Sequence, residues 1–145
     1  MRAALVLTLA AGLMAGCLLP AEAAYNASPA TFKKDCSPGD APAFKIIIPK
    51  DGAQLLIRLW GDALTDLGNS PSFAIRSDTP RSQVNTDLFI CANTRCAPSD
   101  GYLRIGQYKA DQTLDGELLW TTPSGQPVSI PFVASYIAVD PPCEE

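Results

Sequence analysis

Histidine is absent from the 145 residues of this chain, and its absence narrows the possible chemistry more than any motif does. Histidine is the usual general base near neutral pH and the commonest ligand of transition metals. Serine–histidine and cysteine–histidine nucleophile pairs are therefore excluded. Glycine-rich phosphate-binding loops are also missing. A serine–lysine dyad stays open, although no nucleophile motif surrounds any serine. We predict no catalytic residue, no metal site and no cofactor.

Basic residues are few, with 11 Lys and Arg against 15 Asp and Glu, and the formal net charge is -4 at pH 7. Non-specific binding to nucleic acid requires clustered Lys and Arg that displace counterions. The only adjacent basic pair is Lys33–Lys34, which is typical of a solvated segment. We therefore expect no nucleic acid among the partners.

Charge is also missing from a long apolar run at the N-terminus. Arg2 is followed by an uncharged stretch over residues 3–20 and then by Ala21-Glu22-Ala23. A basic residue, an apolar run and small residues before the cut define a secretory signal peptide, so we predict a Sec signal peptide over residues 1–23. No second apolar run approaches the roughly 18 residues of a membrane-spanning helix. No transmembrane segment is expected after processing.

A second processing route is open at Cys17. The sequence Met14-Ala15-Gly16-Cys17 resembles a bacterial lipobox, in which the cysteine is lipidated and becomes the new N-terminus. Two features favour soluble export. Leu is the usual residue where Met14 stands, and the apolar run continues past Cys17 through Leu19. We expect a periplasmic or secreted protein, with a lipoprotein anchored to the membrane at Cys17 as the alternative.

Four cysteines follow the predicted signal peptide, namely Cys36, Cys91, Cys96 and Cys143. An even number in a small exported domain indicates two disulfides. Of the three possible connectivities we favour Cys91 with Cys96 and Cys36 with Cys143. These bridges would close a local loop and tie the two ends of the chain together. The cysteines lack the closely paired spacing of a zinc site.

The segments after the signal peptide differ in their regularity. Residues 24–42 are rich in Ala, Pro, Ser and Asp without sustained periodicity, so we expect an extended leader with little regular structure there. Residues 43–145 are expected to form a single β domain. Residues 61–71 and 93–101 are predicted to be loops. The first strands of the domain are predicted from short apolar runs at 44–48, 54–60, 73–76 and 87–92.

The clearest part of the chain is Tyr102–Tyr136, where apolar and polar residues alternate through three runs separated by turn sequences. A period of two is typical of strands with one buried face, and this stretch predicts a three-stranded antiparallel meander. Pro131 cannot donate a backbone hydrogen bond. Its presence predicts an edge position or a bulge for the last strand.

The regular spacing of short strands, without a helical apolar stripe, indicates an all-β fold. We predict a small antiparallel β-sandwich, immunoglobulin-like (Ig-like) in architecture, with about 7–8 strands and two disulfides. A small closed β-barrel is the alternative. The meander alone does not decide between the two.

Side chains suited to recognition share the polar face of the meander. Tyr102, Arg104 and Tyr108 stand on one face of its first strand, and such residues are enriched at binding hot spots. Asp115 and Glu117 on the next strand complete the candidate recognition surface. Single exposed aromatic residues are common, so the alternative is that these residues cover a second sheet or lie singly on the surface without a partner. The two carboxylates fit neither an EF-hand calcium loop nor the deep cleft of a glycosidase.

These observations predict an exported, non-catalytic binding or accessory protein of a bacterial cell envelope. It would recognise an unknown protein or an envelope component through a face of its β-sheet. A periplasmic enzyme inhibitor is one concrete form of this hypothesis. A carrier barrel stays open and would require an apolar cavity for a small ligand. A carboxylate-dependent hydrolase stays open as well and would require two carboxylates facing each other across a cleft.

Overall fold

One sheet of nine strands makes up most of the structure, a computed structural model that describes residues 27–139 and residue 143. Three short helices interrupt the chain between strands: α1 (Asp62–Thr65) and the 3-10 turns η2 (Leu67–Asn69) and η3 (Arg81–Gln83). Within the described residues no helix is long and apolar enough to cross a bilayer. The strands are β1 (Ser28–Cys36), β2 (Pro42–Lys50), β3 (Ala53–Trp60), β4 (Ser72–Ile75), β5 (Thr86–Ala92), β6 (Arg95–Pro98), β7 (Gly101–Lys109), β8 (Thr113–Thr121) and β9 (Pro127–Tyr136).

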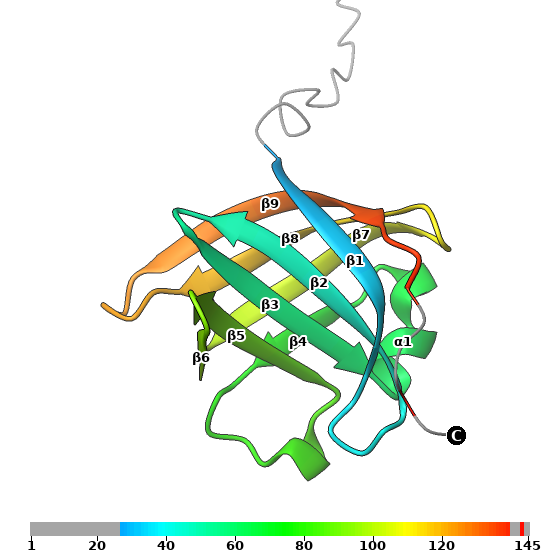
Figure 1. Ribbon diagram of the computed structural model, residues 1–145, viewed down its shortest axis with the longest axis horizontal. Coiled ribbons are helices and arrows are strands. Elements are labelled where there is room, and N and C mark those ends of the chain that lie inside the picture. Colours follow the sequence, from blue (N-terminus) through cyan, green and yellow to red (C-terminus); the bar gives the residue numbers. More distant parts are fainter. Residues whose placement is uncertain (1–26, 140–142, 144–145) are drawn as a thin grey trace, which may run out of the picture.

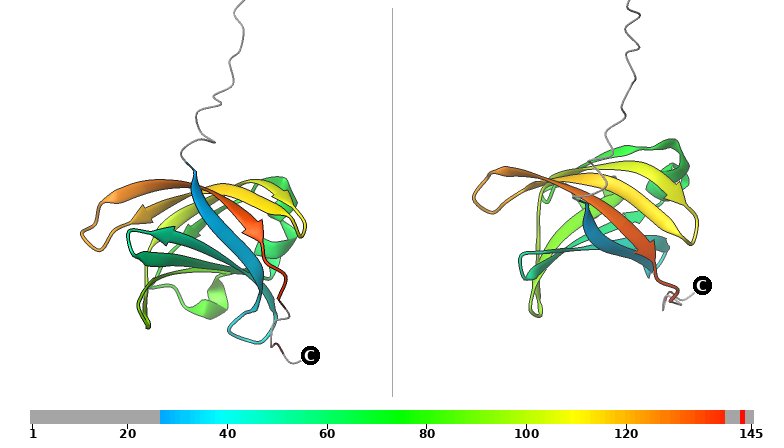
Figure 2. Two further views of the ribbon diagram at one scale, coloured as in Figure 1. Left: turned by 45° about the horizontal axis from the view of Figure 1, so that its top comes forward. Right: turned by 90° about the horizontal axis from the view of Figure 1, so that it is seen from above.

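The strands follow the order β4-β7-β8-β9-β1-β2-β3-β5-β6 across the sheet. Neighbours are antiparallel except β1 and β9, which run parallel with Ser28 opposite Phe132. The all-β prediction is confirmed. The structure differs from the predicted antiparallel arrangement of about 7–8 strands, because the sheet is mixed and has nine strands. The sheet curls around the core and brings β4 near β5, as Figures 1 and 2 show.

The first strand lies in a segment for which we expected little regular structure. Residues 28–36 form β1, in the middle of the sheet between β9 and β2. The side chains of Ala30 and Phe32 are buried, while the intervening residues are more exposed. The expectation of an irregular leader over residues 24–42 is therefore wrong for 28–36. The segment becomes a strand because partners on both sides satisfy its backbone groups.

The core is built from the inward faces that alternation predicts. In β3 these are Leu55, Ile57 and Leu59, all at most 1% exposed. Strands from both halves of the curled sheet contribute, so the apolar area removed from water holds the two halves together. The meander residues in the same core are Leu103, Ile105, Leu114, Leu118, Ile130, Phe132 and Ala134.

Both predicted disulfides are present. Cys36 at the end of β1 is bonded to Cys143, across a sequence separation of 107 residues. Cys91 in β5 is bonded to Cys96 in β6, and the two residues are direct partners in the sheet. The prediction of a loop over residues 93–101 is wrong, because Arg95–Pro98 form β6 and pair with β5. The short strand has no apolar burial of its own, and only its pairing reveals it.

Pro131 does not place its strand at the edge of the sheet, because β9 lies between β8 and β1. The parallel pairing with β1 begins only at Phe132, one residue after Pro131. From Pro127 to Pro131, β9 pairs with β8 alone among the described residues. The predicted edge position is therefore wrong for β9 as a whole, although the proline lies in the part of β9 that has one neighbour. The alternative of a bulge is also wrong, because the register of β9 with β8 is regular through Pro131.

Candidate recognition surface

Four of the five predicted recognition residues meet on the outer face of β7 and β8. Tyr102 and Arg104 project from β7, with side chains exposed to solvent. Asp115 and Glu117 lie on β8, and Glu117 is the direct cross-strand partner of Arg104. Alternation of side chains along a strand places these residues on one face, opposite the buried Leu103. The structure thus brings this part of the predicted surface together.

Tyr108 lies on the other face, so the prediction that it shares a face with Tyr102 is wrong. Ile105 pairs with Gly116, but the pairing resumes with Tyr108 opposite Leu114, which means that β7 contains one extra residue. This β-bulge reverses the alternation beyond it. The ring of Tyr108 packs at the core boundary, with its centroid 6.3 Å from that of Phe32.

The environment of Tyr108 agrees with an inward position. Burial raises the pKa of its phenol above the usual value, and the negative charge of Asp111 and the neighbouring Tyr136 act in the same direction. Phe44 of β2 approaches the same ring, with centroids 6.1 Å apart. Tyr108 therefore helps to join β7 to β1 and β2 across the core and is not part of the outer surface.

The carboxylate of Asp115 has a structural partner at this bulge. Its Oδ1 accepts a hydrogen bond from the backbone N–H of Gln107 at 2.9 Å. Because Gln107 lies in the bulge, its N–H has no partner in the regular hydrogen-bond pattern between β7 and β8, and the carboxylate supplies the acceptor. A methyl group on Gly106 would overlap the same oxygen, so a larger residue there would force the Asp115 carboxylate out of this position. Asp115 and Gly106 thus fix the shape of β7 where the surface begins.

Arg104 and Glu117 form an exposed ion pair in the middle of the surface. Nη1 of Arg104 lies 3.7 Å from Oε2 of Glu117, and the two side chains are 62% and 36% exposed. Ser129 of β9 donates its hydroxyl to Oε1 of Glu117 at 2.5 Å. Exposed pairs of this kind contribute little to folding stability, about 1 kcal/mol or less. Both charges therefore remain available to a partner.

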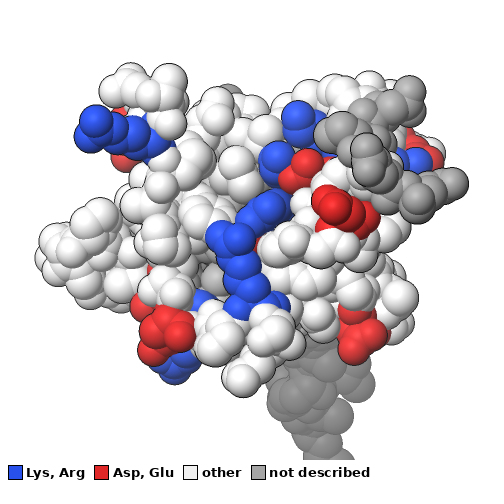
Figure 3. All heavy atoms as spheres, turned by 60° about the horizontal axis from the view of Figure 1, so that its bottom comes forward, with Lys and Arg blue, Asp and Glu red and all other residues white. Residues whose placement is uncertain are grey.

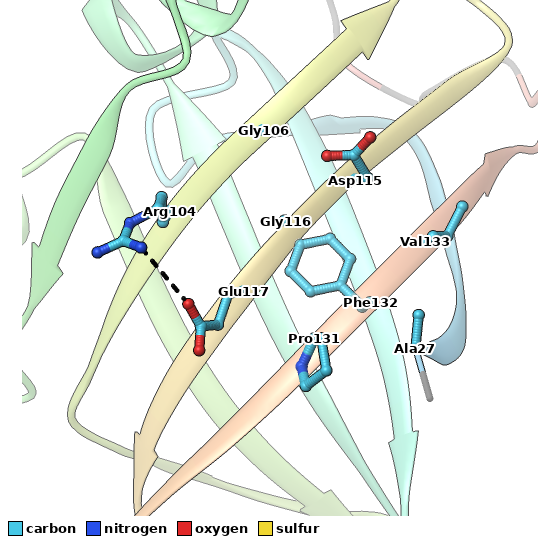
Figure 4. Close-up of a pocket in the computed structure, with 9 residues that line it drawn as sticks. All are labelled: Ala27, Arg104, Gly106, Asp115, Gly116, Glu117, Pro131, Phe132 and Val133. Carbon is cyan, nitrogen blue, oxygen red and sulfur yellow. Dashed lines mark ion pairs between the residues drawn. The ribbon is translucent and has the colours of Figure 1, made fainter. Parts of the chain in front are cut away.

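A hollow of about 540 Å³ lies beside this ion pair on the outer face of β7, β8 and β9. Arg104, Asp115 and Glu117 supply charge along β7 and β8, whereas Pro131 and Val133 of β9 supply apolar surface (Figure 4). The hollow thus offers charged and apolar contacts side by side, as small recognition sites commonly do.

The floor of this hollow depends on Gly116, the direct partner of Phe132 in the sheet. A Cβ on Gly116 would approach Cζ of Phe132 to 3.0 Å and would overlap the backbone oxygen of Arg104. Gly116 therefore lets the Phe132 ring lie against the bare backbone of β8 and brings β7 close to it.

An apolar pair that sequence reasoning missed extends the surface. Tyr102 and Leu119 are direct cross-strand partners on β7 and β8, and each side chain is 39% exposed. Ala74 of β4 pairs with Tyr102 from the other side. A second hollow of about 330 Å³ lies at these three residues. The signal was present in the alternation, since Leu119 occupies the same polar face as Asp115 and Glu117.

Asp100 follows β6 and lines the wall of this second hollow. It also contacts the loop between β4 and β5. Its Oδ1 accepts a hydrogen bond from the backbone N–H of Ser77 at 2.6 Å. This bond holds the pKa of the carboxyl below its usual value, with smaller contributions from the Ser77 hydroxyl and the charge of Arg76. The hollow thus has a fixed polar wall beside its apolar pair.

Within residues 27–139 and 143, no three histidine, cysteine, aspartate or glutamate side chains come close enough together to hold a metal ion. Comparison of the chain with protein-family models, with curated proteins and with solved structures found no match.

Proposed function

We propose that the chain is an exported, non-catalytic binding or accessory protein of a bacterial cell envelope. It recognises a protein or an envelope component through the outer face of β7, β8 and β9. The observation that carries this proposal is the exposed pair of Tyr102 and Leu119 beside the Arg104–Glu117 ion pair. These four residues, together with Pro131 and Val133 of β9 in the adjoining hollow, are called the meander surface below.

The composition of the meander surface supports recognition. Tyr and Arg are enriched among the residues that dominate binding energy, and they act best next to apolar neighbours that exclude water. The exposed Tyr102–Leu119 pair supplies such neighbours, and one hollow lies at this pair while another lies at the ion pair. A sheet face is also rigid, so little conformational entropy is lost when a partner binds.

The disulfides support the compartment that we propose. Two disulfides fit an oxidising location such as the periplasm or the extracellular space. The sequence pattern of residues 1–23, which lie outside the described residues, supports Sec-dependent export. Cys17 also lies outside them, and a lipoprotein form is the alternative.

We further infer that the curled sheet works as a sandwich of two layers. The order of the strands divides into β4-β7-β8-β9 and β1-β2-β3-β5-β6, and both parts supply side chains to one core. A closed barrel would require a pairing between the two ends of this order, and the described residues contain none. The sandwich leaves two outer faces on opposite layers, each open to a partner.

An enzyme inhibitor is the specific form of this function that the small, disulfide-linked fold favours. Inhibitors present a rigid surface whose shape changes little on binding. The meander surface has such rigidity, because β7, β8 and β9 are paired along their length.

Site-specific photo-crosslinking in an exporting bacterium tests the proposal. A photoreactive residue at Leu119 should capture a discrete partner, whereas one at Gly39, which stands in open space in the turn before β2, should not. The captured protein is then identified by mass spectrometry. Equal labelling from both positions, or turnover of a defined substrate by the purified chain without a captured partner, would contradict the proposal.

A further inference from the structure

The outer face of the other layer carries a row of charged residues in register. Lys33 of β1 pairs with Lys45 of β2, Lys45 pairs with Arg58 of β3, and Arg58 pairs with Asp87 of β5. Three cations thus occupy neighbouring positions across three strands, about 4.8 Å apart from strand to strand. Figure 3 shows Lys and Arg side chains as a continuous stripe over this face.

Two carboxylates hold this row in place. Nζ of Lys45 lies 2.6 Å from Oδ2 of Asp35. Arg58 donates from Nε to Oδ1 of Asp87 at 3.1 Å and from Nη2 to Oδ2 at 2.6 Å. All four of these side chains are less than a quarter exposed, so their neighbours restrict the positions that they can adopt. Like charges directly opposite one another destabilise a sheet, and the carboxylates offset that cost.

Arg81 of η3 continues the stripe beyond Arg58. The guanidinium groups of Arg58 and Arg81 lie 5.5 Å and 5.7 Å from the centroid of the Phe89 ring. Such contacts between a cation and an aromatic ring orient both arginines. A hollow of about 190 Å³ lies alongside, and Lys45, Arg58 and Phe89 contribute to its lining together with the disulfide between Cys91 and Cys96.

We propose that these residues form a second recognition site, which binds an acidic polypeptide segment. The basic row comprises Lys33, Lys45, Arg58 and Arg81. It is concentrated on one face of a chain whose net charge is -4, and its four cations outnumber the two carboxylates that lie among them. A cationic stripe in such a chain attracts an anionic partner and orients its approach.

The two carboxylates within the row favour a polypeptide over a uniformly charged polymer. Asp35 and Asp87 lie beside the cations. They would repel a polymer that carries a negative charge on every unit and has no hydrogen-bond donor to offer them. An acidic polypeptide alternates carboxylates with backbone N–H groups, and those groups can donate to Asp35 and Asp87. In other proteins, arginine clusters bind acidic peptide motifs through charge-assisted hydrogen bonds to the carboxylates.

This second site is independent of the meander surface. The basic row lies on β1, β2, β3 and η3, whereas the meander surface lies on β7, β8 and β9, on the other side of the pairing between β9 and β1. A chain with two such faces can hold two partners at once or be wrapped by one. Loss of the meander partner would leave the acidic-segment site untouched, so the two proposals fail separately.

Paired charge variants test the basic row. Lys33→Gln with Arg81→Gln removes two of its cations and leaves Asp35 and Asp87 with their ion-pair partners. Lys34→Gln with Lys109→Gln is the matched control, because it changes the net charge equally at two exposed residues outside the row. Circular dichroism and thermal unfolding establish that both variants are folded.

The purified protein, labelled with nitrogen-15, is titrated with a short polyglutamate peptide and, in parallel, with a polyglutamine peptide. We expect backbone shifts on β1, β2, β3 and at Phe89 with polyglutamate only. The row variant should bind about fivefold to tenfold more weakly and the control variant less than about twofold. Raising the salt concentration from about 0.05 to 0.2 M should also weaken binding.

Three outcomes would overturn this assignment: no binding of polyglutamate, equal weakening by both charge variants, or binding of anionic phospholipid vesicles or a sulfated polysaccharide in place of the peptide.

Discussion

Oδ1 of Asp115 accepts a hydrogen bond from the backbone N–H of Gln107 at 2.9 Å. This bond stabilises the bulge in β7 that directs the Tyr108 side chain toward the core. The Asp115 carboxylate on the outer face therefore helps to fix which side chains of β7 are exposed on that face. Beyond the bulge, an aromatic residue that would have been exposed packs against the core of the curled sheet.

Replacing Gly106 with alanine should destabilise the fold, because the new methyl group would overlap Oδ1 of Asp115. We expect a loss of about 1 to 3 kcal/mol in the free energy of unfolding, measured by urea denaturation. Gly39→Ala is the matched control, since a Cβ there meets nothing within 4 Å. If both variants had the stability of the unaltered protein, the described bulge geometry would be wrong.

The two tyrosines of β7 should differ in their effect on stability. Tyr108→Ala removes a ring that packs against Phe32 and Phe44, and we expect a loss of about 2 to 3 kcal/mol, less than for a fully buried aromatic residue. Tyr102→Ala removes a ring that is 39% exposed and should cost about 1 kcal/mol or less. Urea denaturation of the two variants measures this difference. The reverse order would place Tyr108 outside.

The two disulfides should contribute unequally. Cys36 and Cys143 close a loop with a sequence separation of 107, whereas Cys91 and Cys96 are separated by 5. In the chain-entropy account, the long loop contributes about 4 to 5 kcal/mol and the short loop less. Paired substitution to alanine at each bridge, followed by urea denaturation, compares them. A larger loss at Cys91 and Cys96 would mean that the short bridge acts by fixing β6 against β5.

Acid should weaken the contact between Asp100 and Ser77. The pKa of Asp100 is lower in the folded protein than its ordinary value, chiefly because the N–H of Ser77 binds the ionised carboxylate. Its stabilisation is therefore complete above the ordinary aspartate pKa and is lost as pH falls through the lower, folded value. The stability difference between the unaltered protein and Asp100→Asn should shrink across that interval, as measured by urea denaturation at several pH values. A constant difference would count against the bond.

Local signals were sufficient for much of the fold. The turn at Asp51-Gly52 has positive φ at both residues, 48° and 78°, as the Asp-Gly pair between two apolar runs indicates. Alternation also predicted which side chains of β3, β8 and β9 face the core, because one face of each strand is buried. These features depend on residues that are close together along the chain, and they can therefore be predicted from the sequence.

The features that sequence reasoning missed depend on pairings between distant residues. Strand β1 has β9 as one partner, and the two are about a hundred positions apart in the chain. The bulge in β7 appears only once the register with β8 is known. The basic row joins Lys33, Lys45 and Arg58, which are neighbours solely because three strands lie side by side. The pattern of residues within a single strand does not predict such a row.

The parallel pairing of β1 with β9 also sets the order in which the chain can complete its fold during synthesis. A growing chain that has not yet produced β9 offers β1 only one of its two neighbours. Until then β1 is an open edge, and open edges recruit other chains. Contacts over such long separations also form slowly. The pairing at the centre of this sheet therefore cannot form before β9 is available, and the chain gains from being kept apart from its copies until then.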